Sequence, residues 1–488
     1  MAEIMFNDLR EYIREVKKVD RCKIFEGADW DLEIGTLTEI EASDPNSPLL
    51  IFDQIKGYLP GYRVVTNFIH TPRRFALMTG LPAGATAMDL VKAWRQKVKP
   101  GFKPIPPVEL KTGPIKENVH LGADIDLFEF PAPKWHELDG GRYIGTGHMV
   151  VQKDPDEGWV NLGTYRVQVH DRSTATIHVT GGKHGGMIRK KYWDRGLGCP
   201  AAVVCGQDPL LWTACSSTQI PWGVSEYDYA GWLRGRPVEV IKGPVTGLPI
   251  PAAAEIVLEG EIVRPGTETR DEGPFGEWPG YYAGYSLGPR PEAAFKIKSI
   301  LHRNDPIILG APPLVPAIDT FSHGKQIMRA ADVWDRLDKE VPGVKGVWYV
   351  ENVGQRHMVV VSIEQKYGGH AKQTAMALGG FLASAYRNKF VIIVDDDIDP
   401  SNINEVLWAM CTRCDPADAI EIIKGCWGGT SDPALPPDKL ARRQLEHSKV
   451  LIMACKPYHW IKDFPPTTRA TPELIKKVME KWKDVLKR

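Results

Sequence analysis

Hydrophobic and polar positions follow a helical spacing at the start of the chain. Leu9, Ile13 and Val16 share one face of a helix that Asn7 can cap. Mixed helix and strand signals follow, up to a proline-rich stretch at residues 99–114. Because proline removes a backbone donor, this stretch excludes a regular helix and a central strand. We therefore place a linker or domain edge there.

The middle of the chain, from about residue 120 to residue 300, follows a strand pattern instead. Short runs of β-type residues recur there, separated by Gly and Pro. This predicts an antiparallel barrel or sandwich with few helices. After residue 305 helix and strand signals alternate again, and residues 390–399 form an apolar strand that ends in acids. Such a strand is typical of a sheet covered by helices.

The last segment has the spacing of an amphipathic helix that begins after Thr471, with Pro472 at its first position. Leu474, Val478 and Trp482 share its apolar face, and its polar positions carry more Lys and Arg than acid. Two interpretations stay open. The helix docks on a second subunit, or it packs on its own domain.

The length and charge of the chain limit its class. With 488 residues it exceeds one hydrophobic core, and the changes of pattern divide it into domains at 1–115, 116–305 and 306–488. Lys plus Arg and Asp plus Glu both total 61, and this balance does not indicate a nucleic-acid partner. No apolar run indicates a membrane span, and the N-terminus lacks the order of a signal peptide. We therefore expect a cytoplasmic protein.

Two motifs resemble metal sites without their usual context. Cys411 and Cys414 form a C-x-x-C that lacks a second pair or nearby histidines, so we interpret them as two thiols at a helix end. The eight cysteines are scattered and do not indicate a disulfide framework. Asp395, Asp396 and Asp397 resemble a magnesium site, but the chain has no G-x-x-x-x-G-K-[ST] loop to hold a phosphate. We interpret them as an acidic turn at a strand end.

The sequence EGPFGE places Glu272 and Glu277 in a turn, because its Gly and Pro residues oppose a helix. A turn can point both carboxylates into one cavity, where they need an opposing cation unless one keeps its proton. Arg166 is the natural counter-ion, and such a set suits proton transfer to or from carbon. Asn161, five residues before Arg166, faces the other side of a regular strand unless a bulge intervenes. Surface glutamates and an exposed strand arginine are the alternative.

Further segments carry candidate ligands. His184 lies between two Gly pairs, which let the backbone approach a ligand closely or simply form a flexible loop. Ser216 and Ser217 could hold a phosphate or the edge of a flavin, and Glu226 could bind a hard cation. Asn161, His184 and Glu226 together offer nitrogen and oxygen ligands, which suit manganese or magnesium.

Taken in order, these segments resemble the UbiD family of reversible decarboxylases over nearly the whole chain. The most specific parts are N-x-x-x-x-R at 161–166, EGPFGE at 272–277 and the strand-to-acid stretch that ends in FVIIVDDDID. The resemblance implies an α+β fold: a central flavin-binding split β-barrel flanked by an N-terminal α/β domain and a C-terminal α/β domain. The resemblance also implies that the C-terminal domain assembles the chain into a homodimer or a higher homo-oligomer.

The resemblance also implies prenylated FMN, made by a flavin prenyltransferase, with Mn²⁺ or Mg²⁺ and K⁺ near its phosphate. Asn161, His184 and Glu226 look like the metal ligands. The cofactor contacts that it implies are Asn161, Tyr165, Arg166, Lys183, His184, Ser216, Ser217, Thr218, Glu226 and Lys372. Thr218 departs from the Met-Pro that commonly follows the paired serines, which affects side-chain contacts with the flavin.

The function implied is that of a carboxy-lyase. The substrate is an aromatic or heteroaromatic acid, phenolic and α,β-unsaturated acids included, and CO2 leaves from an adduct of substrate and prenylated flavin. Arg166, Glu272 and Glu277 look like the catalytic set, with Glu277 as the proton donor.

The substrate and the physiological direction stay open. Lys183, Trp278 and Trp427 are candidates for the substrate pocket, with core packing as the alternative for both tryptophans. Two rival functions are a flavin-free scaffold subunit of a carboxylase complex and a flavin-free, metal-dependent hydrolase. The complete Arg166, Glu272 and Glu277 set argues against a scaffold, which need not keep it.

Overall fold

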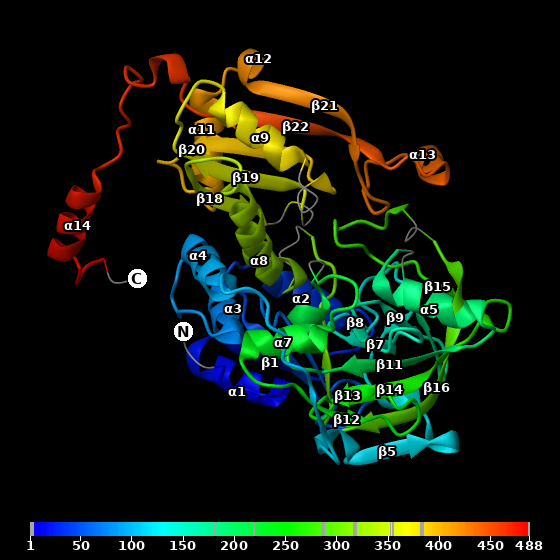
Figure 1. The fold of residues 1–488 in the computed structure, drawn as a ribbon. Helices are drawn as coiled ribbons and strands as arrows, with labels where there is room; N and C mark the ends of the chain where they lie inside the picture. Colours follow the sequence, from blue (N-terminus) through cyan, green and yellow to red (C-terminus); the bar gives the residue numbers. More distant parts are fainter. Residues whose placement is uncertain are drawn as a thin grey trace.

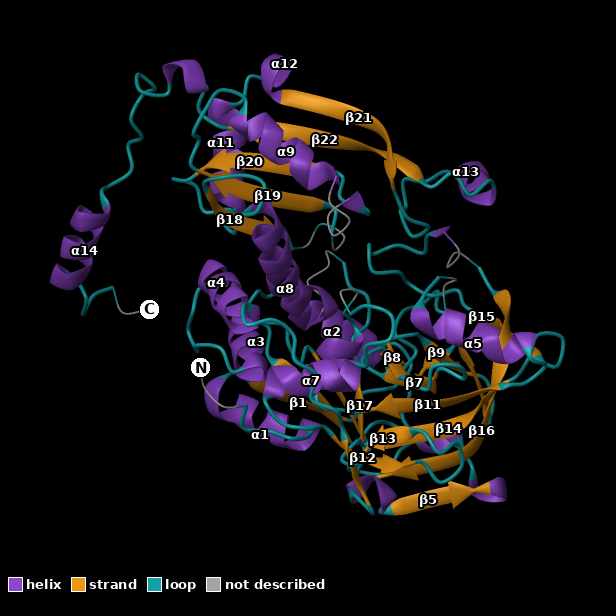
Figure 2. Ribbon diagram, in the orientation of Figure 1, coloured by secondary structure: helices purple, strands orange, loops and turns teal. Residues whose placement is uncertain are grey.

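A computed structural model of the chain describes residues 4–179, 182–217, 220–284, 288–315, 320–351, 353, 356–380 and 385–486. The N-terminal and central sheets form one body, and the last sheet forms a second body beside it (Figure 1; Figure 2). Helix α8 (Thr320–Leu337) runs between the two bodies.

The N-terminal sheet has four strands in the order β1-β2-β3-β17. Asp8 rather than the predicted Asn7 caps the first helix, because its carboxylate accepts the Glu11 backbone N–H at 2.7 Å. Strand β17 follows residue 305 yet pairs with β3, so the chain returns to this sheet after the central region. The bounds are β1 (Cys22–Glu26), β2 (Leu49–Asp53), β3 (Arg63–Thr66), β17 (Ile307–Leu309), α1 (Leu9–Val19), α2 (Glu33–Ala42), α3 (Pro72–Thr79) and α4 (Ala87–Val98).

The central region is a ten-stranded antiparallel sheet that curls into a half-barrel, as the strand pattern predicts. Its main path runs β6-β9-β10-β16-β14-β11-β7-β8, and β5 and β15 also pair with β16. The bounds are β5 (Asn118–Leu121), β6 (Arg142–Tyr143), β7 (Met149–Lys153), β8 (Val160–Gly163), β9 (Val167–Val169), β10 (Thr174–Ile177), β11 (Cys199–Cys205), β14 (Ile256–Ile262), β15 (Thr269–Glu272) and β16 (Arg290–His302).

Short elements surround this half-barrel. Strand β4 lies in the proline-rich stretch and occupies the edge of a small sheet of order β13-β12-β4, as expected where a central strand is excluded. The bounds are β4 (Val108–Leu110), β12 (Glu239–Lys242), β13 (Pro249–Pro251), η1 (Pro114–Lys116), η2 (Gly122–Asp124), η3 (Leu127–Glu129), α5 (His184–Asp194), α6 (Pro209–Cys215) and α7 (Glu226–Arg234).

The C-terminal sheet is mixed, in the order β18-β19-β20-β22-β21. The predicted apolar strand is β20, which is buried from Val391 to Asp395. Arg413 donates to Asp395 and Asp397 at 2.7 Å each, in agreement with an acidic turn. The bounds are β18 (Val344–Tyr349), β19 (Met358–Ile363), β20 (Phe390–Asp395), β21 (Ile420–Trp427), β22 (Glu446–Ala454), α9 (His370–Gly380), α11 (Ile403–Arg413), α12 (Pro416–Ala419), α13 (Pro437–Ala441), η5 (Tyr458–Trp460) and α14 (Pro472–Lys481).

The terminal helix α14 forms as predicted, with Thr471 as its cap, and stands apart from the body. Leu474, Val478 and Trp482 are 50%, 42% and 49% exposed. The interpretation of a helix packed on its own domain is therefore wrong for this chain on its own.

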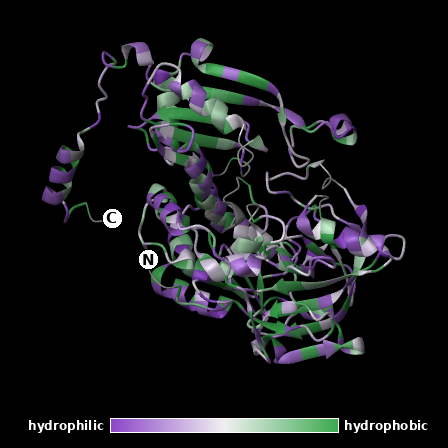
Figure 3. Cartoon of the chain, in the orientation of Figure 1, coloured by the Kyte–Doolittle hydropathy of each residue, from purple (hydrophilic) through white to green (hydrophobic). Residues whose placement is uncertain are grey.

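Hydrophobic residues concentrate in the strands of the central and C-terminal sheets (Figure 3). One buried cluster fills the half-barrel, and another joins the N-terminal helices to α8 and the C-terminal sheet. None of the described helices is long and apolar enough to span a bilayer.

Candidate active site

A break between two strands brings Asn161 and Arg166 to the same cavity. Strand β8 ends at Gly163, and β9 begins only at Val167, so the two-residue alternation of a regular strand is interrupted. Gly163 permits a tight turn here, since a Cβ at this position would lie 2.4 Å from the Tyr165 ring. Both side chains then line one cavity of about 490 Å³.

Arg166 joins the two glutamates of the EGPFGE turn. Its Nε and Nη2 donate to the two carboxylate oxygens of Glu272 at 2.7 Å each, and Nη1 donates to Glu277 at 3.0 Å. The Glu272 side chain is fully buried, whereas that of Glu277 is 21% exposed and lines the cavity. The two acids therefore share one cation but differ in their access to a ligand.

The surroundings keep Glu272 ionised. Burial raises the pKa of Glu272, but the hydrogen bonds and charge of Arg166 outweigh it and leave that pKa below its ordinary value. The ring of Phe275 lies 5.0 Å from the Arg166 guanidinium and 4.5 Å from the Tyr143 ring, so an apolar wall backs the ion pair. Burial also raises the pKa of the Tyr143 hydroxyl, which donates to Glu272 at 3.2 Å.

The three predicted metal ligands come from different elements and line the same cavity. Asn161 lies on β8, His184 is the first residue of α5, and Glu226 is the first residue of α7. His184 therefore lies at the start of a helix rather than within a flexible loop. Two N-termini of helices thus face this end of the cavity, and their partial positive charge favours an anion such as a phosphate.

The chemistry of this trio fits a hard divalent cation. Glu226 is buried and accepts the Leu162 backbone N–H at 2.7 Å. Burial raises its pKa to about 8, and a bound cation would lower that pKa. Burial and the charge of Lys183 lower the pKa of His184, which keeps its imidazole neutral for ligation.

The predicted cofactor contacts divide into three groups. Tyr165, Lys183, Ser216 and Ser217 line the cavity, and the Tyr165 hydroxyl accepts the Gly185 backbone N–H at 3.0 Å. The Ser216 hydroxyl donates to the Thr213 carbonyl at the end of α6. Lys372 does not line this cavity, because it pairs with Glu421 on the surface of the C-terminal sheet. Thr218 lies outside the described residues.

The two candidate pocket tryptophans differ. Trp278 lines the cavity, whereas Trp427 lies on β21, is 53% exposed and packs against the Tyr386 ring at 5.0 Å. In this structure Trp427 is therefore neither a wall of this cavity nor a core residue. Its neighbour Tyr386 lines the cavity in its place.

The C-terminal region adds cations that the sequence analysis missed. Lys325, Arg356 and Arg387 line the cavity opposite the central residues. Burial and the neighbouring arginines Arg329 and Arg387 lower the pKa of Arg356 to about 9. No motif connects these residues in the sequence, so only their shared cavity identifies them.

Models of one protein family match all three parts of the chain. A family model for the 3-octaprenyl-4-hydroxybenzoate carboxy-lyase Rift-related domain (UbiD) matches residues 107–316. Models for the N-terminal and C-terminal domains of the same family match residues 17–94 and 325–454.

Individual relatives cover most of the chain. It is 32% identical over 474 residues to the phenolic acid decarboxylase of Sedimentibacter hydroxybenzoicus. This alignment covers 94% of this chain and 93% of the relative. It is also 32% identical over 430 residues to the pyrrole-2-carboxylic acid decarboxylase of Pseudomonas aeruginosa, with 84% and 83% covered.

A solved structure with bound flavin has the same fold. The UbiD-class enzyme HmfF from Pelotomaculum thermopropionicum, in complex with FMN, aligns with a TM-score of 0.83 at 27% identity, over 96% of this chain and 98% of that chain. An evolved dimeric form of HmfF in complex with prFMN aligns at 0.79 with 26% identity, over the same shares.

Proposed function

The chain belongs to the UbiD family, and on that premise we propose that it catalyses the reversible, non-oxidative decarboxylation of an aromatic or heteroaromatic acid with prenylated FMN. The observation that supports this best is the Arg166 guanidinium, which binds the fully buried Glu272 and holds Glu277 at the wall of the cavity. A carboxy-lyase needs such an acid to control a proton on carbon.

The two glutamates have separate roles in this proposal. Glu272 stays ionised and fixes the Arg166 guanidinium, because both of its oxygens accept from Arg166. Glu277 accepts from Arg166 and faces the cavity, so it can deliver a proton to the carbon that loses CO2. In the carboxylation direction Glu277 removes that proton.

The cofactor supplies an acceptor for the electrons left on the ring carbon, which no side chain can provide. Asn161, His184 and Glu226 would hold Mn²⁺ or Mg²⁺, and Ser216 and Ser217 would contact the phosphate near K⁺. The metal anchors the phosphate in this proposal, since its three ligands lie on elements other than the one that carries the glutamates.

The cavity supports a flat, anionic substrate. Trp278 and Phe275 provide apolar walls, and Lys183 provides a cation whose pKa burial lowers, with help from Arg356 and Arg387. The relatives act on phenolic and pyrrole carboxylic acids, which share this shape and charge. We therefore propose a planar aromatic or heteroaromatic monoacid or phenolic acid as the substrate class.

We propose that the chain has three domains, 1–115, 116–305 and 306–488. Strand β17 belongs to the third range but pairs with the sheet of the first domain. The exposed apolar face of α14 supports a homodimer or a higher homo-oligomer in which this helix contacts a second subunit. Removing residues 471–488 should then lower the number of subunits in the assembly, measured by native mass spectrometry, whereas an unchanged number of subunits contradicts this role.

Free thiols among the described cysteines support a cytoplasmic location, where a flavin prenyltransferase supplies the cofactor.

One experiment tests the proposal. The chain is co-expressed with a flavin prenyltransferase, purified without oxygen and weighed intact by native mass spectrometry. A mass increment for prenylated FMN and a divalent metal, followed by CO2 release from a panel of aromatic acids, is expected. Protein that stays free of flavin despite this supply would overturn the proposal in favour of the scaffold or the hydrolase.

A further inference from the structure

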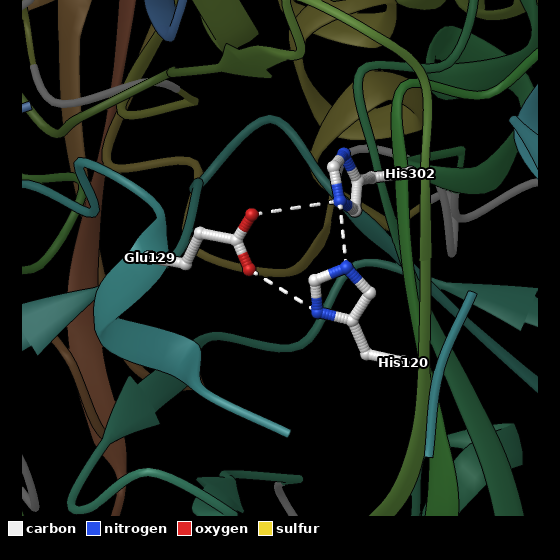
Figure 4. Close-up of side chains that lie close together, drawn as sticks. All are labelled: His120, Glu129 and His302. Atoms are coloured by element: carbon white, nitrogen blue, oxygen red, sulfur yellow. Dashed lines mark hydrogen bonds and ion pairs between the residues drawn. The ribbon is translucent and has the colours of Figure 1, made fainter. Parts of the chain in front are cut away.

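A second group of metal-ligating side chains lies at the margin of the central sheet. It consists of His120 on β5, Glu129 at the end of η3 and His302 at the end of β16. Figure 4 shows the three side chains pointing toward one another. None of them lines the cavity described above, so this group is separate from the candidate active site.

The register of the sheet brings the two histidines together. Strand β5 pairs antiparallel with β16, with His120 opposite Ile300 and His302 opposite Asn118. His120 and His302 therefore occupy diagonal positions two residues apart on one face of the sheet. The segment after β5 then folds back and places Glu129 beside both rings.

The distances suit a shared cation. Nε2 of His302 lies 3.3 Å from Nε2 of His120, and Nδ1 of His120 lies 3.3 Å from Oε2 of Glu129. Oε1 of Glu129 lies 3.6 Å from Nε2 of His302. His120 turns a different nitrogen to each neighbour, and with one ligand atom from each residue the three atoms lie within 4.8 Å of one another. Ligand atoms bound to a tetrahedral zinc at 2.0–2.1 Å are about 3.3 Å apart, so the His120 ring must rotate to complete that geometry.

Neighbouring hydrogen bonds orient two of the three ligands. Nδ1 of His302 contacts the Arg303 carbonyl at 2.9 Å, and because a carbonyl only accepts, Nδ1 carries the proton. With this proton on Nδ1, the neutral ring presents the lone pair of its Nε2 toward Glu129. The Tyr62 hydroxyl donates to Oε1 of Glu129 at 2.8 Å. Such outer contacts are the usual support of metal-bound histidine and carboxylate.

The lone pair of His302 and the Glu129 carboxylate thus face each other beside a half-buried His120, and a bound cation would satisfy both groups. We propose that His120, Glu129 and His302 bind a divalent transition metal, with zinc as the probe of choice. Two imidazoles and one carboxylate match zinc better than magnesium or calcium, which prefer oxygen ligands alone. The bound ion would tie the edge strand β5 and η3 to β16.

Zinc binding to the full-length, flavin-loaded protein tests this proposal. One equivalent of zinc beyond the active-site metal is expected, measured by competition with a chromophoric chelator and by elemental analysis. His120→Gln and Glu129→Gln should lose this equivalent, while Tyr62→Phe should weaken it by roughly 10–100-fold. His459→Gln, which removes an exposed histidine elsewhere, is the matched control and should bind as the native chain does.

Cobalt provides a second readout that needs no variant. Cobalt bound by two nitrogens and an oxygen in a tetrahedral site should absorb strongly in the visible range, and zinc should displace it. The competing occupant is a proton on His120, which could donate to both His302 and Glu129. In that case no extra zinc binds, or it binds equally to the native chain and both ligand variants, and the proposal is wrong. The outcome is independent of flavin content and of CO2 release.

Discussion

Replacing Arg166 by Met should destabilise the central domain strongly, because it leaves a buried carboxylate without its cation. Glu272 is fully buried and accepts from Nε and Nη2 of Arg166, while Glu277 accepts from Nη1. Removing one partner of a buried ion pair costs about 3–5 kcal/mol. For a domain of 150–250 residues about 1 kcal/mol shifts the melting temperature by ~2–4 °C, so a loss of roughly 6–20 °C is expected.

The size of this effect should depend on pH. In the native chain the lowered pKa of Glu272 stabilises the fold above the pKa of the unfolded carboxyl, and this stabilisation is lost as pH falls through the folded pKa. In Arg166→Met the strongest lowering influence is gone, so burial outweighs the charges of His178 and Arg290 and raises the pKa of Glu272. The ionised carboxylate then destabilises the fold near neutral pH. Protonation relieves that cost. The gap in melting temperature between the two proteins should therefore be largest at pH 7.5 and smaller at pH 5.

Thermal unfolding followed by circular dichroism measures both effects. Arg195→Met is the matched control, because Arg195 pairs with Asp156 where both side chains are about 45% exposed. Such a surface pair contributes about 0–1 kcal/mol. The double variant Arg166→Met with Glu272→Met should recover part of the loss, since no buried charge is left unpaired. A melting temperature for Arg166→Met within the range of the control would refute this reasoning.

Three further predictions concern the cavity. Glu277→Gln should lower the rate of CO2 release by about 10²–10⁴-fold with flavin content unchanged, and full activity would exclude Glu277 as the proton donor. His184→Ala should lower flavin occupancy, measured by absorbance after anaerobic purification. The control His459→Ala should keep normal flavin occupancy. If His184→Ala lost the metal but kept a full complement of flavin, the anchoring role of the metal would be wrong. Because the pKa of Glu226 is about 8, manganese affinity should fall about tenfold per pH unit below that value. Titrations with Mn²⁺ at pH 8.5 and pH 6 check this, and an affinity independent of pH would show that Glu226 is not a ligand.

Local chemistry in the sequence predicted much of the architecture. Helical spacing identified α1 and α14, apolar runs identified the strands of the half-barrel and β20, and proline excluded a central strand at β4. These features depend on neighbours within a few residues, which the sequence displays directly. The turn at EGPFGE is of the same kind, because Gly and Pro restrict the backbone wherever they occur.

Contacts between distant segments were decided only in three dimensions. Arg166 and Glu272 are 106 residues apart. Their motifs resemble those of the family's catalytic residues, but the motifs do not show that the two side chains touch. Regular strand alternation would place Asn161 and Arg166 on opposite faces, but the break after β8 brings both side chains to the same cavity. Trp427 on β21 packs against Tyr386, and Lys372 on α9 pairs with Glu421, so neither side chain lines the cavity.

The zinc candidate gives the clearest physical reason for this division. His120 and His302 are 182 residues apart, and neither belongs to a spacing that indicates a metal site. Only the register of β5 against β16 places them on one face, and register depends on the pairing of whole strands. Local sequence therefore determines which elements form, while the tertiary structure decides which side chains meet, because burial and strand pairing act across the entire chain.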